Sequence, residues 1–283
     1  MYKQYIPQQV SQALNEDLNF QSAQDGDITA QLIPEQQQAK ARVISRQPAI
    51  ICGCEWVEET LKQVDSNLEL EWFVKDGDKV ERDDVLFVVT GSARSILTAE
   101  RTCLNFMQAL SGTATATNEY VSIVQGIGST THILDTRKTI PGLRFAQKYA
   151  VKCGGGENHR IGLFDAYLIK ENHIQAAGGI AQAVTKAQQL HPGKKVEVEV
   201  ETMDELNQAI VAGADIVMLD NFDVPQTQEA IVFSAGRVKL EASGNMDLNK
   251  FKAYAELNID YISIGGLTKH IDAIDLSMRF IEE

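Results

Sequence analysis

Hydrophobic and polar residues follow two rhythms along this chain, and the change between them divides it. In the first part, short runs that alternate with a period of two predict strands at residues 41–46, 68–74 and 84–91, with a turn at residues 76–78. Residues 1–25 and 51–64 favour helices instead. The first part is therefore expected to be an α/β unit of roughly a hundred residues.

A long helical region is predicted between residues 97 and 125. Leu104, Met107 and Leu110 fall on one face of it, and Gly112 is expected to interrupt the helix. Arg101 lies off this apolar stripe, so its own context indicates a solvent-facing side chain.

After residue 128 the pattern changes to strands that alternate with helices. Six strands are predicted, at residues 131–135, 165–170, 195–201, 215–220, 237–243 and 260–266. A helix should follow each of the last five, and the final helix should end near Glu283. This alternation predicts a parallel sheet with right-handed crossovers. Six such units favour a βα barrel, although the spacing alone leaves an open doubly wound sheet as an alternative.

Each predicted strand ends in a group that can take part in chemistry. In chain order the strand ends carry Arg137 with Lys138, Lys170, Glu199 with Glu201, Asp220, Ser243 with Gly244, and Gly265 with Gly266. In βα barrels, functional side chains lie at the carboxyl ends of the strands. Six such groups in register predict one shared site at the barrel mouth.

The charge distribution indicates an anionic substrate. Residues 135–173 hold seven Lys and Arg against four acids, within a chain whose formal net charge is −13. Arg and Lys form charge-assisted bonds to carboxylate and phosphate. The overall negative charge argues against nucleic acid or an anionic membrane as a partner.

Three further features of the sequence predict a cytoplasmic protein. No apolar run is long enough to span a membrane, and the first residues lack the apolar stretch of a secretory signal. The four cysteines show neither zinc-site nor CxxC redox spacing, which is typical of reduced thiols.

Alternating acids suggest an acidic wall inside the barrel. Residues at every second position share one face of a strand. The acids and polar groups placed on such faces are Glu197, Glu199 and Glu201 on one strand, and Lys239, Glu241 and Ser243 on another. A buried carboxylate without a partner is costly, so these acids should pair with inward cations or a metal ion. An exposed edge strand is the alternative.

Two glycine-containing turns could hold a phosphate. Gly265 and Gly266 follow the last predicted strand, and Ser243, Gly244 and Asn245 follow the strand before it. Barrels often bind phosphate after their last strands. The residues alone therefore leave phosphoryl transfer, aldol chemistry on a sugar phosphate and phosphoribosyl transfer open.

Six longer motifs narrow this choice: DTRKTIPGLR, KYAVKCGGGENHRIGLFDAYLIKENH, VEVEVE, MLDNF, EASGN and YISIGGLTKH. They resemble the quinolinate phosphoribosyltransferase family, the carboxylating nicotinate-nucleotide pyrophosphorylases of NAD biosynthesis. The resemblance extends upstream to EDLNFQSAQDGDIT and LTAERTCLNFMQALSGTAT and covers nearly the whole chain in order. Gly266 stands where many relatives have Ala, and a Gly is missing near Asp83 and Asp84. Neither departure touches the catalytic set.

The resemblance implies an N-terminal α/β sandwich over residues 1–110 and an irregular α/β barrel of about seven strands over residues 111–283. The chain end could pack back on the N-terminal domain. The resemblance also implies a homodimer, with higher assembly possible. In that dimer the N-terminal part of one subunit closes the barrel mouth of the other, and Arg101 reaches quinolinate from the neighbouring subunit.

The resemblance also assigns the site residues. Quinolinate would be held by Arg101, Arg137, His159, Arg160 and Lys170. Phosphoribosyl pyrophosphate would meet Lys138, Glu199, Asp220, Ser243, Gly244, Asn245, Gly265 and Gly266. Lys138, Glu199 and Asp220 would be catalytic, and Glu199 and Asp220 would also bind Mg²⁺. No nucleophile or general base is expected.

Three alternatives remain beside quinolinate phosphoribosyl transfer with decarboxylation. They are a paralogue from molybdate gene clusters, a nicotinate phosphoribosyltransferase, and a non-enzymatic anion-binding scaffold. The adjacent pairs Arg137–Lys138 and His159–Arg160 favour a dicarboxylate substrate. The presence of Glu199 and Asp220 argues against the scaffold.

Overall fold

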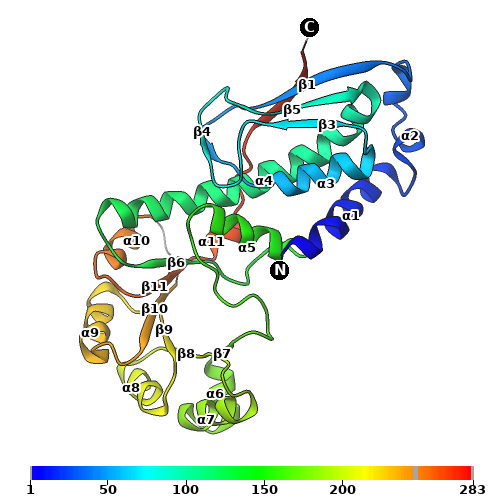
Figure 1. Cartoon of the computed structure of the whole chain (residues 1–283). Helices are drawn as coiled ribbons and strands as arrows, with labels where there is room; N and C mark the ends of the chain where they lie inside the picture. Colours follow the sequence, from blue (N-terminus) through cyan, green and yellow to red (C-terminus); the bar gives the residue numbers. More distant parts are fainter. Residues whose placement is uncertain (1, 245–247, 282–283) are drawn as a thin grey trace. The chain divides into compact units, whose positions relative to one another are not determined.

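A computed structural model describes residues 2–244 and 248–281 (Figure 1). The chain forms two compact units. The first consists of residues 2–118, 139–155 and 270–281, and the second of residues 119–138 and 156–269 apart from the gap at 245–247. Among the described residues, no helix combines the length and the apolar character that crossing a membrane would need.

The first unit is built on a four-stranded antiparallel sheet in the order β12-β1-β5-β3. Its strands are β1 (Gln38–Ser45), β3 (Glu69–Trp72), β5 (Val85–Ser92) and β12 (Leu276–Phe280). A two-stranded sheet pairs β2 (Ala49–Ile50) with β4 (Lys79–Val80). The three strands predicted for this part of the chain are confirmed.

The prediction of a helix at the chain end is wrong. After the short helix α11 (Gly266–Lys269), the chain forms β12, which pairs with β1 from Ala41 opposite Phe280 to Ser45 opposite Leu276. The partner strand lies more than two hundred residues earlier in the sequence. The local pattern of a five-residue strand contains no trace of such a long-range pairing.

Helices cover one face of this sheet (Figure 1). The helical elements of the first part of the chain are η1 (Tyr2–Tyr5), α1 (Ile6–Leu18), α2 (Ala23–Gly26), η2 (Ala30–Leu32), α3 (Cys54–Val64), α4 (Ala93–Gly126) and α5 (Arg144–Cys153). Their buried residues recur at helical spacing, as Ile6, Val10 and Leu14 do on α1. The core of this unit has two clusters: apolar residues of α3 and α4 pack against the four-stranded sheet, and the stripe of α1 packs against α3, α4 and α5.

Gly112 does not interrupt α4, which runs unbroken for 34 residues. A Cβ at Gly112 would come within 2.3 Å of the backbone oxygen of Asp272. The glycine therefore serves close backbone packing, which the sequence pattern could not distinguish from a helix break.

The second unit holds a six-stranded parallel sheet in the order β6-β11-β10-β9-β8-β7. The strands are β6 (His132–Leu134), β7 (Tyr167–Ile169), β8 (Val196–Val200), β9 (Ile216–Asp220), β10 (Lys239–Ser243) and β11 (Tyr261–Ser263). The intervening helices are α6 (Glu171–Ala177), α7 (Ile180–Leu190), α8 (Met203–Ala212), α9 (Val224–Ser234) and α10 (Leu248–Ala255). All six predicted strands are confirmed.

The strand order supports the barrel over the open doubly wound sheet. Strands β7 to β11 follow one another in a single direction, and the first strand, β6, pairs with the last, β11. A doubly wound sheet would reverse direction at a switch point. The structure has six strands where the resemblance implied about seven. Beside β6, a single bridge between Leu134 and Glu157 continues the sheet.

Capping residues fix the turns that follow two strands bearing site residues. At the start of α8, Thr202 accepts the backbone N–H of Glu205 at 3.2 Å, and the Glu205 carboxylate accepts the N–H of Thr202 at 3.1 Å. Asp223 and Gln226 form the same reciprocal box at the start of α9. Each box ends the preceding strand at a defined residue.

Candidate active site

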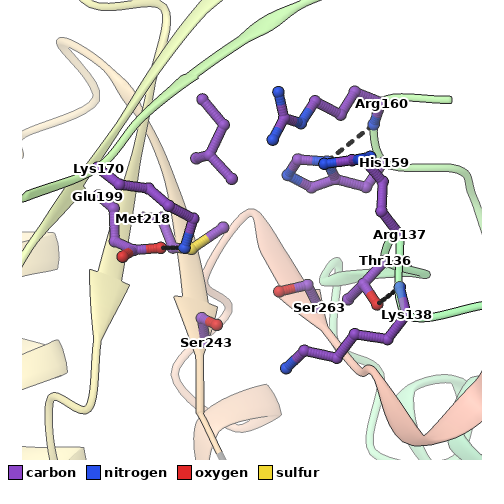
Figure 2. Close-up of a pocket in the computed structure, with 11 residues that line it drawn as sticks. Thr136, Arg137, Lys138, His159, Arg160, Lys170, Glu199, Met218, Ser243 and Ser263 are labelled. Carbon is purple, nitrogen blue, oxygen red and sulfur yellow. Dashed lines mark hydrogen bonds and ion pairs between the residues drawn. The ribbon is translucent and has the colours of Figure 1, made fainter. Parts of the chain in front are cut away.

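A cavity of about 320 Å³ lies at the carboxyl ends of the strands of the second unit (Figure 2). It brings together seven of the predicted site residues: Arg137, Lys138, His159, Arg160, Lys170, Glu199 and Ser243. Figure 2 shows Arg137, His159 and Arg160 on one side of the cavity and Lys170, Glu199 and Met218 on the other. The cavity therefore has basic groups on two opposite walls.

Lys170 and Glu199 form an ion pair, with Nζ 2.6 Å from Oε2. The pair follows from sheet register, because Ile169 of β7 lies beside Val198 of β8, and Lys170 and Glu199 are the next residues along the chain. The Lys170 side chain is 43% exposed and the Glu199 side chain is mostly buried, at 13%. This agrees with the expectation that inward acids pair with inward cations.

Other predicted residues lie at neighbouring strand ends but do not line the cavity. Asp220 ends β9 opposite Ser243 of β10, and its Oδ2 accepts a hydrogen bond from Asn221 Nδ2 at 2.9 Å. Gly244 follows with a φ of 138°, a conformation that favours glycine. Asn245 lies outside the described residues.

Gly265 and Gly266 occupy the turn after β11. A Cβ at Gly265 would come within 2.9 Å of Lys138 Cδ, so the glycine gives room to the lysine chain. Gly266 begins α11, and Thr268 donates its hydroxyl to the carbonyl of Lys138 at 2.8 Å. The turn therefore holds Lys138 at the cavity wall.

Arg101 belongs to the first unit, on α4. Its side chain is 58% exposed, and its Nη2 lies 3.7 Å from Glu100 Oε1. Within that unit it lines a separate cavity of about 380 Å³.

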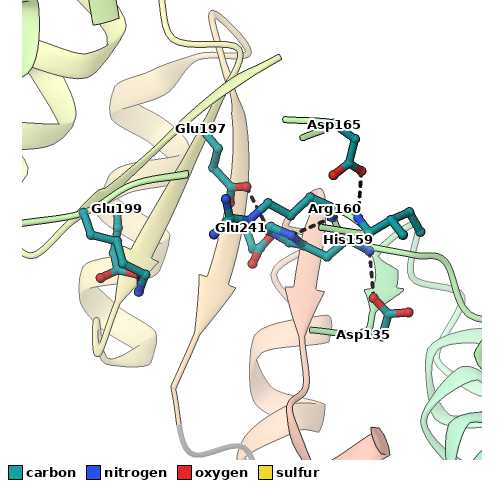
Figure 3. Close-up of polar contacts among 9 residues, drawn as sticks. Asp135, His159, Arg160, Asp165, Glu197, Glu199 and Glu241 are labelled. Atoms are coloured by element: carbon teal, nitrogen blue, oxygen red, sulfur yellow. Dashed lines mark hydrogen bonds and ion pairs between the residues drawn. The ribbon is translucent and has the colours of Figure 1, made fainter. Parts of the chain in front are cut away.

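The loop that carries His159 and Arg160 is held by side chains rather than by secondary structure (Figure 3). Four consecutive backbone N–H groups, at residues 159–162, each donate to a side chain. Asp135 accepts the first at 3.0 Å, the His159 ring Nδ1 accepts the second at 2.8 Å, and Asp165 accepts the third and fourth at 2.7 and 2.9 Å. Because these four N–H groups already donate to side chains, they are not available to bind an anion. The loop therefore contributes its side chains to the cavity.

Two buried carboxylates lie behind the loop. Glu197 of β8 is 4% exposed and Glu241 of β10 is fully buried. Their Oε2 atoms lie 2.8 and 3.6 Å from His159 Nε2. Burial, together with the neighbouring Glu197, raises the pKa of Glu241 to about 8, although His159 and the Ser263 hydroxyl act in the opposite direction.

Two residues that were expected to face the barrel interior, Glu201 and Lys239, are exposed instead. Glu201 is exposed, because β8 ends at Val200 and the Glu201 N–H donates to Glu205 of the α8 cap. Lys239 is also exposed and pairs with Asp260 at 2.6 Å. The period-two pattern was therefore correct only inside the strand and failed at its ends.

The guanidinium groups of Arg137 and Arg160 repel each other as long as no anion is bound between them. Burial, and secondarily Arg137, lowers the pKa of Arg160, while Glu197 and Asp165 oppose the shift. The Nε of Arg137 is buried and makes no hydrogen bond within the described part of the chain. A bound anion would supply the missing acceptor and relieve the repulsion between the two guanidinium groups.

The comparison with known proteins identifies the family of this site. Residues 27–111 match the N-terminal domain of quinolinate phosphoribosyl transferase, and residues 113–279 match its C-terminal domain. The chain belongs to the quinolinate phosphoribosyl transferase family. It is 39% identical over 254 residues to the probable nicotinate-nucleotide pyrophosphorylase [carboxylating] of Bacillus subtilis (strain 168), covering 89% of this chain and 87% of that relative.

Two further relatives of the phosphoribosyl transferase agree. Quinolinate phosphoribosyltransferase [decarboxylating] 2b, mitochondrial, of Nicotiana tabacum is 38% identical over 278 residues, or 91% of this chain and 78% of the relative. The solved structure of the nicotinate-nucleotide pyrophosphorylase from Francisella tularensis has a TM-score of 0.94 and 52% identity, over 99% of this chain and 97% of that one.

Sequence reasoning recognised only the two acids, Glu197 and Glu241, of a second layer of residues beneath the strand ends. Each member lies two positions before a predicted site residue and therefore on the same face of its strand. These residues are Leu168, Glu197, Met218, Glu241 and Ser263. Thr136 in the cavity wall, and Asp135 and Asp165 beneath the loop, were also missed. The same period of two could have found the missed members Leu168, Met218 and Ser263.

Proposed function

We propose that this phosphoribosyl transferase joins quinolinate to the ribose of phosphoribosyl pyrophosphate and releases CO₂, pyrophosphate and nicotinate mononucleotide. The observation that carries the proposal is a single cavity with two half-buried arginines on one wall and a lysine on the other. Quinolinate is a planar dianion, and a dianion needs several cations around it once it leaves water.

Quinolinate carries two adjacent carboxylates on a pyridine ring. Arg137 and Arg160 offer guanidinium forks that match carboxylate geometry, and Lys170 offers a point charge from the opposite wall. Leu168 and Met218 provide apolar surface for the ring. The relatives whose printed names include quinolinate and decarboxylation favour this substrate over nicotinate and over the molybdate-cluster paralogue.

The same strand ends would hold phosphoribosyl pyrophosphate. We assign Glu199 and Asp220 to the ribose hydroxyls, Lys138 to the pyrophosphate, and the glycine turns to the phosphates. The donor set fits Mg²⁺, which takes one or two protein carboxylates and completes its shell with phosphate oxygens and water. Glu199 lies one residue before the end of β8 and Asp220 ends the adjacent strand β9, so the two supply such a pair. When bound, Mg²⁺ neutralises part of the pyrophosphate charge.

The reaction then follows from charge placement. The pyridine nitrogen attacks C1 of the ribose as the bond from C1 to the pyrophosphate oxygen breaks. Lys138 offsets the charge that develops on the leaving pyrophosphate. The ring nitrogen becomes positive and stabilises the electron pair that stays on the neighbouring ring carbon when the bond from that carbon to its carboxylate breaks. CO₂ leaves, the ring carbon binds a proton from water, and the ring nitrogen keeps its positive charge.

We further propose a cytoplasmic homodimer in which Arg101 completes the site of the neighbouring subunit. The exposed side chain of Arg101 and the place of this arginine in the family motif support the assignment. The free thiols of all four cysteines are consistent with a reducing compartment.

Calorimetric titration with quinolinate and with nicotinate tests the substrate assignment directly. Quinolinate should bind at least about tenfold more tightly, which corresponds to one additional charge-assisted hydrogen bond. Equal affinities for the two acids would contradict a dicarboxylate site.

A further inference from the structure

Two cysteine side chains meet inside the first unit. Cys52 lies between β2 and α3 and is fully buried, whereas Cys153 ends α5 and is partly buried. Their sulfur atoms lie within 4.8 Å of each other, and a carboxylate oxygen of Asp76 lies within the same distance of both. The two thiols form a hydrogen bond with each other. Because the cysteines are far apart in the sequence, only the folded unit brings them together.

The backbone around both cysteines is anchored on α4. The Cys52 N–H donates to Ser111 Oγ at 2.9 Å, and the Ser111 hydroxyl donates to the carbonyl of Cys52 at 3.2 Å. Beside Cys153, Gly154 packs so closely that a Cβ there would come within 2.3 Å of the backbone oxygen of Ala114. Ser111 and Ala114 lie about one helical turn apart on α4. A single helix therefore holds the two segments that carry the sulfur pair.

We propose that Cys52 and Cys153 are a redox modification site, and that hydrogen peroxide joins them in a reversible disulfide. The Cys153 thiolate attacks one peroxide oxygen, the O–O bond breaks, and Cys153 becomes a sulfenic acid as hydroxide leaves. The sulfur of Cys52 then attacks the sulfur of Cys153, and the S–S bond forms as the hydroxyl group leaves with the Cys52 proton as water. The two thiols lose two electrons in total, and one peroxide is reduced to two molecules of water.

The surroundings of the pair give the two thiols different roles. The hydrogen bond from Cys52 lowers the pKa of Cys153, with help from the Tyr149 hydroxyl, although burial and Asp76 oppose the shift. Burial, and secondarily Cys153, raises the pKa of Cys52 well above its usual range. The thiolate is the form that reacts, and Cys153 is also the more exposed of the two. Cys153 is therefore the thiol that meets peroxide, and Cys52 is the resolving thiol beside it.

The contacts of Asp76 favour a dithiol over a metal site at this place. Its Oδ1 accepts the backbone N–H groups of the two residues that follow Cys52, at 2.8 and 3.0 Å. Its Oδ2 accepts the Tyr149 hydroxyl at 2.8 Å. Three of the roughly four acceptor positions of a carboxylate are thus taken by donors within the unit. Asp76 joins the turn that carries Cys52 to α5, which carries both Tyr149 and Cys153.

Peptide mapping by mass spectrometry tests the proposal on the full-length protein. The reduced protein is treated with hydrogen peroxide, the remaining thiols are blocked under denaturing conditions, and the peptides are analysed without reduction. We expect a linked peptide that joins Cys52 to Cys153, and the return of both thiols after dithiothreitol. A disulfide between Cys52 and Cys54, or thiols that stay reduced, would overturn the proposal. Bound Zn²⁺ that protects both thiols from peroxide would also overturn it, in favour of a metal site.

Serine variants test the order of the two steps. In Cys52→Ser, dimedone should trap a sulfenic acid at Cys153, whereas in Cys153→Ser the remaining Cys52 should react at least about tenfold more slowly. Cys103→Ser is the matched control, because Cys103 is fully buried in the same unit but lies outside the cluster, and it should form the disulfide as wild type does. Equal reactivity of the two single thiols would contradict the assigned order. If a variant does not fold, the wild-type peptide map still decides whether the disulfide forms.

Discussion

Lys170 and Glu199 are joined by an ion pair of 2.6 Å across the carboxyl ends of β7 and β8. The resemblance assigns the lysine to quinolinate and the glutamate to the ribose and Mg²⁺. Under the roles proposed above, the pair would link the two substrate sites, and we expect a change at one residue to affect binding at both.

Glu199→Gln keeps the shape of the side chain and removes its charge. Turnover should fall by roughly a hundred- to a thousandfold if Glu199 stabilises the transition state. The substitution releases Lys170 from the ion pair. Because a partly exposed ion pair contributes little free energy, the affinity for quinolinate should stay equal or rise slightly. Calorimetry and steady-state kinetics on one preparation measure both effects. Markedly weaker quinolinate binding would show that Glu199 mainly positions Lys170.

Asp220→Asn is the matched control for that variant. The polar partner of Asp220 is the neutral Asn221, so the substitution releases no cation. We expect a loss of turnover and a higher Mg²⁺ requirement, with quinolinate affinity maintained. Titration of rate against Mg²⁺ concentration measures the requirement. An unchanged requirement together with altered quinolinate affinity would refute the assignment to metal and ribose.

Mixing two inactive variants tests the role of Arg101. If Arg101 acts across a dimer interface, Arg101→Ala and Lys170→Ala subunits should form mixed dimers with one intact site each. Random mixing should then restore about a quarter of the wild-type sites. Activity is compared before and after subunit exchange, and mass spectrometry confirms that mixed dimers form. Mixed dimers without activity would place Arg101 in the site of its own chain.

Glu241 should make stability depend on pH. Burial raises its pKa from 4.5 to about 8 in the folded protein. Between these values the unfolded chain loses the proton and the folded chain keeps it, so the contribution to stability declines as pH rises toward 8, by at most about 1.4 kcal/mol per pH unit.

The variant Glu241→Gln lacks this proton and supplies the reference. Urea unfolding at fixed protein concentration should show wild type losing stability relative to the variant between about pH 5 and about pH 8. A difference between the two proteins that stays constant over this range would contradict the raised pKa.

The sequence predicted the second unit better than the first because its signals are local. Each strand and helix of the βα repeat carries its own hydrophobic pattern, and functional groups collect at strand ends. Strand β12 was mistaken for a helix because its partner, β1, lies at the other end of the chain. Gly112 was mistaken for a break because its reason is a backbone contact with Asp272.

Within the site, residue types were predictable and their contacts were not. The pattern and the resemblance together selected Arg137, Lys138, His159, Arg160 and Lys170, all of which line the cavity. The contact between the Arg160 backbone N–H and His159 Nδ1 could not be predicted, because only the folded loop brings the two groups together.

The central claim is tested most directly by product analysis with quinolinate, phosphoribosyl pyrophosphate and Mg²⁺, run beside the same mixture with nicotinate. The account predicts nicotinate mononucleotide from quinolinate, with one CO₂ released for each pyrophosphate, and little product from nicotinate. Comparable turnover of nicotinate, or pyrophosphate released from the quinolinate mixture without CO₂, would contradict it.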